Sequence, residues 1–361
     1  MVTIINATFL NRKRHNIILQ DGKIVDVTDE SVEKTNIIRM PDHVYVSPGW
    51  IDIHTHAFPF FEPYCSVPDD IGYKTGVTTV VDAGSCGADD IDTFYKMAKQ
   101  SPTRVLSFLN ISRVGLKVKN ELADLTSVSY PVLETAIKKY PDMIVGLKAR
   151  MSASIVGTNG LEPLKMAREY SDALNIPLLV HIGNAPPHLN DIANTLKQGD
   201  IITHIYNNKP GNNLFSYLSS IRKAHERGVY LDVGHGTASF SFEVAKKALE
   251  QHIPPHSIST DIYNHNRING PVYNMATTMS KFLALGYPLE KIIACVTENP
   301  AQMIQQEKLG TIKKGAVADL TFFTIENDPA DLEDSYGESL HVEKQIKPYA
   351  VMLGGEYYEL D

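Results

Sequence analysis

Two histidines that stand two positions apart, His54 and His56, are the first residues of this sequence that could do chemistry. They lie in the segment IDIHTH, whose apolar residues are typical of a strand. Side chains two residues apart on a strand point to the same side. Two imidazoles that point together suit a divalent metal ion. The pair alone is also compatible with two polar residues at a strand end, because the chain has 13 histidines.

Four further ionisable residues close apolar, strand-like runs later in the chain. They are Lys148, His181, His204 and Asp261. In a barrel of parallel strands, the C-terminal ends of the strands form the active-site face. Each residue taken alone is best interpreted as a strand-end residue that meets water. Together with the histidine pair they follow one another on five of eight such runs, a pattern that solvated strand ends explain poorly.

Lys148 fits a metal site only in an altered form. A protonated lysine has three donors and no lone pair, so it would repel a metal ion. A neutral lysine can be a ligand, and addition of carbon dioxide would turn it into a carbamate whose oxygens can bridge two ions. The alternative is an ordinary salt bridge to Asp261 or to a nearby glutamate.

The elements that must position these residues alternate along the middle of the chain. Apolar β-rich runs are separated by helix-like stretches, which predicts a parallel sheet with helical crossovers. The runs are 49–54, 77–82, 105–110, 143–148, 177–181, 201–204, 229–233 and 257–261. Eight such units predict an α/β fold with a (β/α)8 TIM barrel. An open doubly wound sheet would need a glycine-rich phosphate turn after an early strand, and the sequence has no GxGxxG.

Both ends of the chain consist of short strand-like runs separated by turn residues. Neither end is long enough to form a satisfactory sheet alone. We therefore predict that residues 1–48 and 312–361 form one small composite β-sandwich domain, with the barrel of residues 49–311 inserted between them.

Composition and charge exclude several classes of protein. With 43% hydrophobic and 21% charged residues, the 361-residue chain is neither disordered nor fibrous. A net charge of −8 without a basic stripe argues against nucleic acid as a partner. Three distant cysteines exclude a disulfide framework. Residues 11–14 are too polar for a signal peptide, and no apolar run is long enough for a membrane span, so we expect a cytoplasmic protein without a membrane partner.

At its motifs the chain resembles the amidohydrolase superfamily, specifically the binuclear dihydroorotase-like and deacetylase-like branch. The matching segments are PGWIDIHTH at 48–56, GLK at 146–148, His181, His204, STD at 259–261, TENPA at 297–301, LGTI at 309–312 and GAVADL at 315–320. The resemblance covers nearly the whole chain. Segment 270–286 resembles a deacetylase-like subgroup, some members of which cleave acetyl esters or amides of small carboxylic acids.

The resemblance implies a binuclear metal centre. His54, His56 and Asp261 would hold the more buried of two divalent ions, for which zinc is the first expectation. His181 and His204 would hold the second ion, and carbamylated Lys148 would bridge both. The implied reaction is hydrolysis of an amide or ester bond of a small molecule by a metal-bridging hydroxide, with Asp261 as the catalytic residue that moves the proton to the leaving group. The expected substrate is an N-acetyl or O-acetyl carboxylic acid.

Five residues outside the metal set are expected to shape the substrate site. His235, near the end of the seventh run, would contact substrate or stabilise oxyanion charge as a second catalytic residue. Arg150 could bind a substrate carboxylate in bidentate fashion. Tyr206, Asn207 and Gly270 lie in loops that follow the sixth and eighth runs, where substrate pockets are commonly formed. A structural or solvated role is the alternative for each.

Three other functions remain open at this point. One is ring opening of a cyclic amide, as in dihydroorotases and hydantoinases, and another is deamination of a purine such as adenine. Lys148 argues against deaminases that use one metal ion. The third is a non-catalytic partner protein of the same fold, which the filled ligand positions argue against. By analogy with other barrels of this kind, we expect the protein to be a homo-oligomer. The ligand types suit manganese, iron and cobalt as well as zinc.

Overall fold

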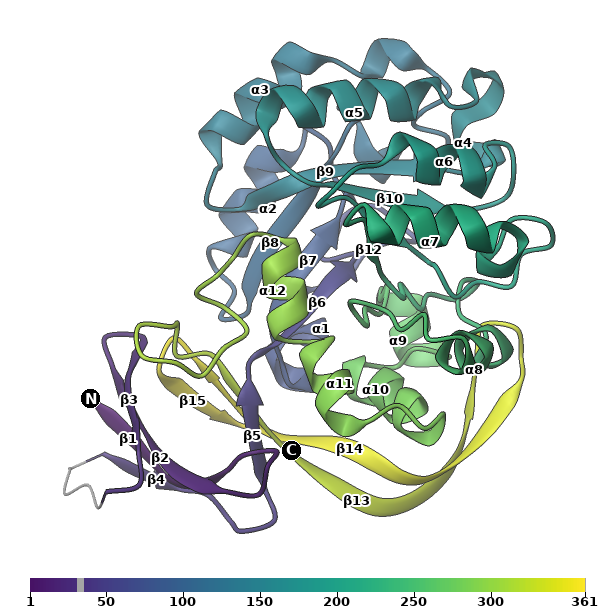
Figure 1. The fold of residues 1–361 in the computed structure, drawn as a ribbon. Coiled ribbons are helices and arrows are strands. Elements are labelled where there is room, and N and C mark those ends of the chain that lie inside the picture. The colour runs from purple at the N-terminus through teal and green to yellow at the C-terminus, as the bar shows by residue number, and fades with distance from the viewer. Residues whose placement is uncertain (31–35, 361) are drawn as a thin grey trace.

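The centre of the molecule is a curled parallel sheet. A computed structural model describes residues 1–30 and 36–360 of the chain (Figure 1). Seven strands form the sheet, in the order β12-β11-β10-β9-β8-β7-β6. Their bounds are β6 Trp50–Thr55, β7 Val77–Ala83, β8 Arg104–Asn110, β9 Ile144–Met151, β10 Leu178–Ile182, β11 Ile201–Thr203 and β12 Tyr230–Leu231.

Residues 257–262 close this sheet into a ring. On one side, Val233 N donates to Ser257 O at 3.1 Å. On the other side, Asp261 N donates to His54 O at 2.7 Å and His56 N donates to Ile262 O at 2.9 Å. The segment forms only isolated bridges, because Asp261 has a left-handed backbone (φ 50°) that no regular strand contains. The predicted α/β barrel is confirmed, with an eighth run that is less regular than expected.

Helices follow the barrel strands and surround the sheet (Figure 1). Their bounds are α1 Pro68–Ile71, α2 Ile91–Ala98, α3 Tyr130–Lys139, α4 Ala153–Val156, α5 Glu162–Leu174, α6 Leu189–Thr195, α7 Leu218–Glu226, α8 Phe242–Glu250, α9 Asn264–Asn269, α10 Met275–Ala284, α11 Leu289–Ala294 and α12 Glu298–Met303. Helix α5 buries Leu164, Ala167 and Ser171 at the spacing of one helix face. Within the described residues, no helix has the length and apolar character that a membrane crossing requires.

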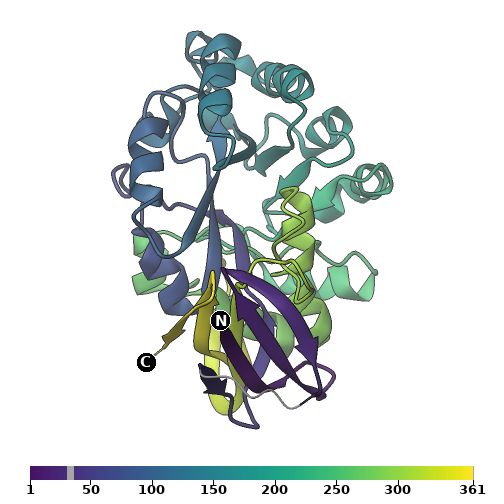
Figure 2. The ribbon, with the colours of Figure 1, turned by 90° about the vertical axis from the view of Figure 1, so that its left-hand side faces the viewer.

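The two ends of the chain join in one β unit, as expected, and where a β-sandwich was predicted its eight strands form one mixed sheet. Strand β5 is its link, because it pairs in parallel with β1 and antiparallel with β13. Figure 2 shows the N-terminal strands beside the C-terminal ones. The bounds are β1 Val2–Thr8, β2 Arg14–Gln20, β3 Lys23–Thr28, β4 Ile37–Arg39, β5 Tyr45–Pro48, β13 Leu320–Glu333, β14 Ser339–Leu353 and β15 Glu356–Glu359. Where the domain boundaries fall remains a prediction.

The antiparallel hairpin of β13 and β14 is much longer than the sequence suggested. Its apolar parts, 318–323 and 349–353, were the only segments recognisable as strands. The hairpin continues through a polar stretch and curves past helix α10, where Ile346 N donates to Ser280 Oγ at 2.9 Å (Figure 1). Its tip, residues 334–338, therefore lies away from the N-terminal strands of the mixed sheet and beside loops of the barrel.

Candidate metal centre

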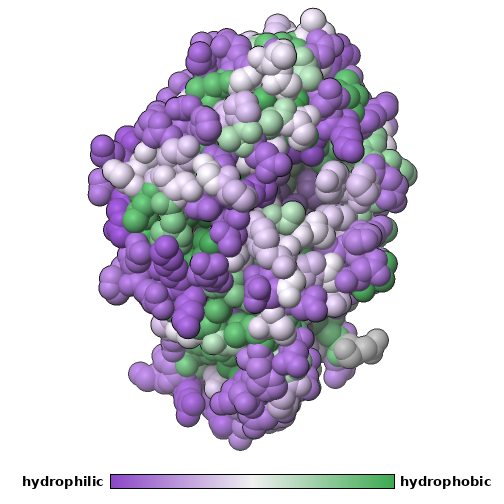
Figure 3. All heavy atoms as spheres, turned by 90° about the vertical axis from the view of Figure 1, so that its right-hand side faces the viewer, coloured by the Kyte–Doolittle hydropathy of each residue, from purple (hydrophilic) through white to green (hydrophobic). Residues whose placement is uncertain are grey.

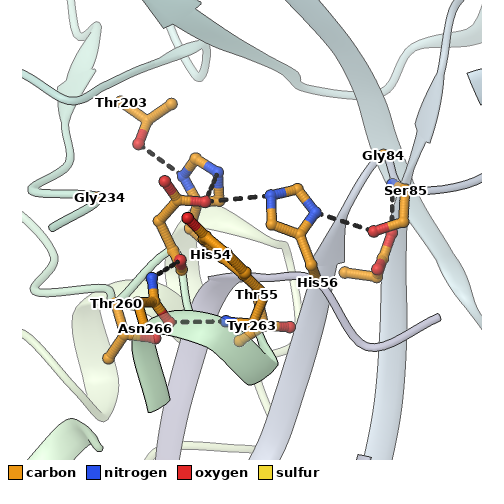
Figure 4. Close-up of polar contacts among 12 residues, drawn as sticks. His54, Thr55, His56, Gly84, Ser85, Thr203, Gly234, Thr260, Tyr263 and Asn266 are labelled. Atoms are coloured by element: carbon orange, nitrogen blue, oxygen red, sulfur yellow. Dashed lines mark hydrogen bonds and ion pairs between the residues drawn. The ribbon is translucent and has the colours of Figure 1, made fainter. Parts of the chain in front are cut away.

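Three of the six predicted ligands meet at the C-terminal end of the barrel. Asp261 Oδ1 lies 3.3 Å from His54 Nε2 and 3.0 Å from His56 Nε2. The ligand atoms of these three residues lie within 4.8 Å of one another. Figure 4 shows that the Nδ1 side of His54 faces the Thr203 hydroxyl and the Nδ1 side of His56 faces the Ser85 hydroxyl. This arrangement turns the Nε2 atoms inward, towards a common point.

The ring of His54 is held in one tautomer by a buried relay. Asp232 is fully buried and its Oδ2 accepts a hydrogen bond from Thr203 Oγ1 at 2.6 Å. Since that hydroxyl donates its hydrogen to Asp232, its oxygen accepts a hydrogen bond from His54 Nδ1, which lies 2.8 Å away. The proton therefore sits on Nδ1, and the lone pair of Nε2 faces the site. Metal-binding histidines are commonly oriented by a partner on the other nitrogen in this way.

The clearest indication that a cation binds at this site comes from His204. Its Nδ1 donates to Gly234 O at 2.6 Å, so Nε2 carries a lone pair. That Nε2 is buried and has no hydrogen-bond partner among the described residues. The ring packs 4.9 Å from His54 and 4.5 Å from His181, centroid to centroid. Burial lowers the pKa of His204 to about 4, so the ring is neutral and free to bind a cation.

Lys148 lies at the centre of the histidine group. Its side chain is buried, and Nζ is 3.4 Å from His54 Nε2. Burial lowers the pKa of Lys148 to about 8, against the attraction of Asp261 and Asp232. The salt bridge considered as the alternative does not form within the part of the chain that the structure describes. The donor set thus fits two divalent ions, provided that Lys148 is neutral or carries an anionic group.

Asp261 is an ionised carboxylate at the floor of the site. Burial raises its pKa, but the hydrogen bond from His56 and the charges of His204 and Lys148 outweigh this effect, so the pKa lies below its usual value. Gly236 is packed against the other oxygen. A Cβ at Gly236 would lie 2.4 Å from Asp261 Oδ2, and the glycine has φ +53°. The carboxylate can therefore take its position only because residue 236 has no side chain.

We expect Gly236→Ala to lose most of the activity, because the added methyl group displaces the Asp261 carboxylate. Gly160→Ala is a matched control, since Gly160 has φ +55° and its Cβ would meet nothing within 4 Å. Both variants carry the left-handed strain of about 1 kcal/mol. Turnover and melting temperature of the two purified variants measure the difference. Equal turnover in both would show that the contact with Asp261 has no catalytic role.

A cavity of about 350 Å³ opens in front of these residues. All the predicted ligands except His204 line it. Figure 3 views the molecule from the side towards which the barrel strands point, and hydrophilic residues surround the hollow there. The volume is at the lower end of the range for small-molecule sites, so the cavity fits a small substrate.

Two cationic side chains stand in the cavity wall beside the ligands. Arg150 was predicted there as a bidentate partner of a substrate carboxylate, but buried Glu121 already takes that face of the guanidinium: Nε donates to Oε1 at 2.9 Å and Nη2 to Oε2 at 2.6 Å. Lys209 was missed, because a lysine in a polar loop gives no sequence signal. Its Nζ donates to Ala238 O at 3.1 Å and lies 3.4 Å from Ser239 Oγ, and burial lowers its pKa.

The structure does not bring four of the predicted substrate residues to the cavity. His235 is buried beside Lys281, with its Nε2 2.9 Å from Lys281 Nζ. Tyr206 is also buried, and its hydroxyl donates to Ile253 O at 2.7 Å. Asn207 Nδ2 donates to His204 O at 2.8 Å and so supports a ligand loop instead. Gly270 lies against the Tyr273 ring.

The wall contains further polar groups that the sequence did not single out. They are Tyr64, Asn110, Lys119, Ser152, Ser154, Asn184, Thr237, Ser239 and Tyr263. Asn110 ends strand β8, Ser154 lies in helix α4, and the others lie in loops after the barrel strands, where polar residues are ordinary. Only the closed barrel shows which of them face inward.

Comparisons with known proteins agree with this geometry. The model of the amidohydrolase family matches residues 45–356. A deacetylase of Enterococcus faecalis is 42% identical over 360 residues, which cover 98% of either protein. A deacetylase of Agrobacterium fabrum is 33% identical over 344 residues, which cover 93% of this chain and 84% of that protein.

Solved structures of high similarity carry the names of other reactions. A crystal structure of an adenine deaminase superposes with a TM-score of 0.96 at 41% identity and covers 99% of both chains. A crystal structure of a dihydroorotase has a TM-score of 0.91 at 31% identity, covering 100% of this chain and 98% of the other. Relatives of nearly equal identity thus differ in the reaction for which they are named.

Proposed function

The chain belongs to the amidohydrolase family, and we propose that this hydrolase removes an acetyl group from an amide or ester whose other part carries a carboxylate. One observation carries the proposal. The same small cavity holds the ligand group of His54, His56 and Asp261 and, in its wall, the ammonium of Lys209. A scissile carbonyl at the ligand group would leave the carboxylate of the substrate within reach of Lys209.

We assign two divalent ions, zinc first, to the six ligands. His54, His56 and Asp261 would hold one ion, and His181 with His204 the other, with carbamylated Lys148 between them. Ions bound there would lower the pKa of water and polarise a carbonyl oxygen. The unpartnered Nε2 of His204 and the neutral state of the buried imidazoles support this assignment.

Asp261 is the group that moves the proton. Because its pKa is below the usual value, it is ionised and accepts a proton from the attacking water. It then gives this proton to the leaving nitrogen or oxygen, which would otherwise depart as a strong base. The second role of Asp261, as a ligand, keeps its oxygens at the place where water is activated.

The charge of the cavity favours an anionic substrate over a purine. Lys119 and Lys209 line it as cations, Arg150 is paired with Glu121, and Asp261 is the one carboxylate among the described lining residues. A partly buried ammonium such as that of Lys209 gains most from an anion that reaches it. Adenine has no negative group that could pair with Lys209. Dihydroorotate does have a carboxylate, but its scissile bond is a ring amide and not an acetyl bond. The names of the Enterococcus and Agrobacterium relatives agree with deacetylation.

A substrate screen on zinc-loaded enzyme tests the proposal. It compares N-acetyl and O-acetyl carboxylic acids with dihydroorotate, hydantoins and adenine, and it includes a sample treated with a chelator. We expect turnover of an acetylated acid, lost with the chelator and restored by zinc. Turnover of adenine or of a cyclic amide with no hydrolysis of any acetylated acid would contradict the proposal.

We expect Lys209→Met to raise KM for the acetylated acid by about 10- to 100-fold, the loss that a charged hydrogen bond gives, with a small change in kcat. Methionine keeps the apolar stem of the side chain and removes the charge. Lys223→Met, an exposed lysine on α7, is the control. The methyl ester of the same substrate should show no such rise, and an equal rise for acid and ester would exclude a carboxylate contact.

A further inference from the structure

At the tip of the β13–β14 hairpin, the phenol group of Tyr336 forms hydrogen bonds with two loops of the barrel. Tyr336 Oη accepts a hydrogen bond from Asn208 N at 2.8 Å and donates one to Ala238 O at 3.3 Å. Asn208 lies in the loop that follows His204, and Ala238 lies in the loop that follows His235. The tyrosine therefore bridges two segments that are 30 residues apart in the chain and that belong to different strands of the barrel.

The neighbouring residues of the tip hold the second loop at more points. Ser335 N donates to Phe240 O at 3.0 Å, and Ser335 Oγ donates to Gly236 O at 2.9 Å. Asp334 Oδ2 accepts from Phe242 N at 2.9 Å, at the start of α8. The other oxygen of this buried aspartate accepts from Tyr336 N at 2.7 Å, which fixes the turn itself.

These two loops carry four of the residues that line the cavity, which are Lys209, Thr237, Ala238 and Ser239. Lys209 directly follows Asn208, and its Nζ is held by Ala238 O and Ser239 Oγ of the other loop. Tyr336 thus contacts the residue before the lysine and also the carbonyl that the lysine ammonium uses. The carbonyl of Gly236, the residue packed against Asp261, is bonded to Ser335. A shift of the tip would move the lysine and its carbonyl partner apart.

We propose that Tyr336 and Ser335 are positioning residues for the substrate, so that the C-terminal hairpin takes part in substrate binding by the barrel. The chain enters the hairpin more than fifty residues after α8 and still returns to the loop before that helix. A phenol suits this task because it is rigid and can accept and donate at once. The part that concerns the carboxylate rests on the proposed function, whereas the clamp on the two loops does not.

Hydrogen–deuterium exchange tests the clamp without any substrate. Tyr336→Phe removes only the hydroxyl of a side chain that is 42% exposed, so the core is left intact. We expect the amide of Asn208 and those of the 236–241 loop to exchange faster, by about 3- to 10-fold, which is the effect of one lost hydrogen bond. Tyr358→Phe on β15, which loses a bond of 2.9 Å to Glu356, is the matched control. Unchanged exchange in the two loops would overturn the proposal.

Kinetics then test the consequence for binding. We expect Tyr336→Phe to raise KM for an acetylated acid by about 3- to 10-fold, with kcat and metal content unchanged, and Ser335→Ala to act in the same direction. A parallel loss of kcat, bound metal and melting temperature would show a merely structural role and overturn the proposal. If wild-type enzyme treats acid and methyl ester alike, the carboxylate contact of Lys209 fails, while faster loop exchange in Tyr336→Phe still supports the clamp.

Discussion

The Asp261→Asn enzyme should bind its metal ions and lose at least about a thousandfold in kcat, the upper part of the range for a general acid–base residue. An asparagine oxygen can still face His54 and His56, so the ligand group keeps its shape. The amide cannot accept the proton of the attacking water, and it has none to give to the leaving group. Elemental analysis of the protein and steady-state kinetics on the same sample separate the two roles.

Asp142→Asn is the control for this variant. Asp142 pairs with Lys99 at the surface, 2.7 Å away, and has no contact with the cavity. Its loss should leave kcat within experimental scatter. Full turnover by Asp261→Asn would assign the proton transfer to another group, and loss of both ions would show that Asp261 acts chiefly as a ligand.

The barrel and the ligand group could be predicted because both follow from simple periodicities. Parallel strands end on one face of a barrel, so residues that close successive strands must meet there. His54 and His56 point together because they are two apart on β6. These statements need no knowledge of loops, and the structure brings His54, His56 and Asp261 together at that face, as the pattern requires.

His235 shows where this reasoning stops. Strand β12 ends at Leu231, and the residues on either side of His235 have left-handed backbones, with φ 49° at Gly234 and φ 53° at Gly236. Two such turns rotate the side chain away from the direction that an extended strand would give it. Its ring consequently faces Lys281 of α10 and stacks on Phe240, 4.5 Å between centroids. The sequence predicts that a residue lies near a strand end, but it does not predict where the side chain points once the strand has ended.

The polar hairpin shows a second limit. Between 326 and 344 most residues are polar or charged, and Val342 is the one fully buried apolar side chain within these two strands. So few apolar residues do not identify a strand in the sequence. The contacts of Tyr336 with Asn208 and Ala238 join segments nearly a hundred or more residues away. No local pattern encodes contacts of that range.

Replacement of Lys148 should reduce both the metal content and the kcat of the enzyme. Lys148→Met keeps most of the volume of the buried side chain beside Gly84, where a Cβ would lie 2.7 Å from the lysine stem, so the fold should persist. The variant cannot form a carbamate. We expect bound metal to fall from about two ions per chain to one or fewer, and kcat to fall by more than the 10- to 100-fold that an outer-shell partner costs.

Lys209→Met provides the matched control, because it makes the same change in the same cavity. Its metal content should equal that of the wild type, since Lys209 is no ligand. Carbon-13 NMR after growth with labelled bicarbonate adds a direct measurement: a carbamate signal in wild type and in Lys209→Met, and none in Lys148→Met. Two ions per chain in Lys148→Met would mean that the histidines and Asp261 hold both ions without a bridge. One ion in every protein would mean that metal binding does not depend on Lys148, and a mononuclear mechanism would then replace the binuclear one.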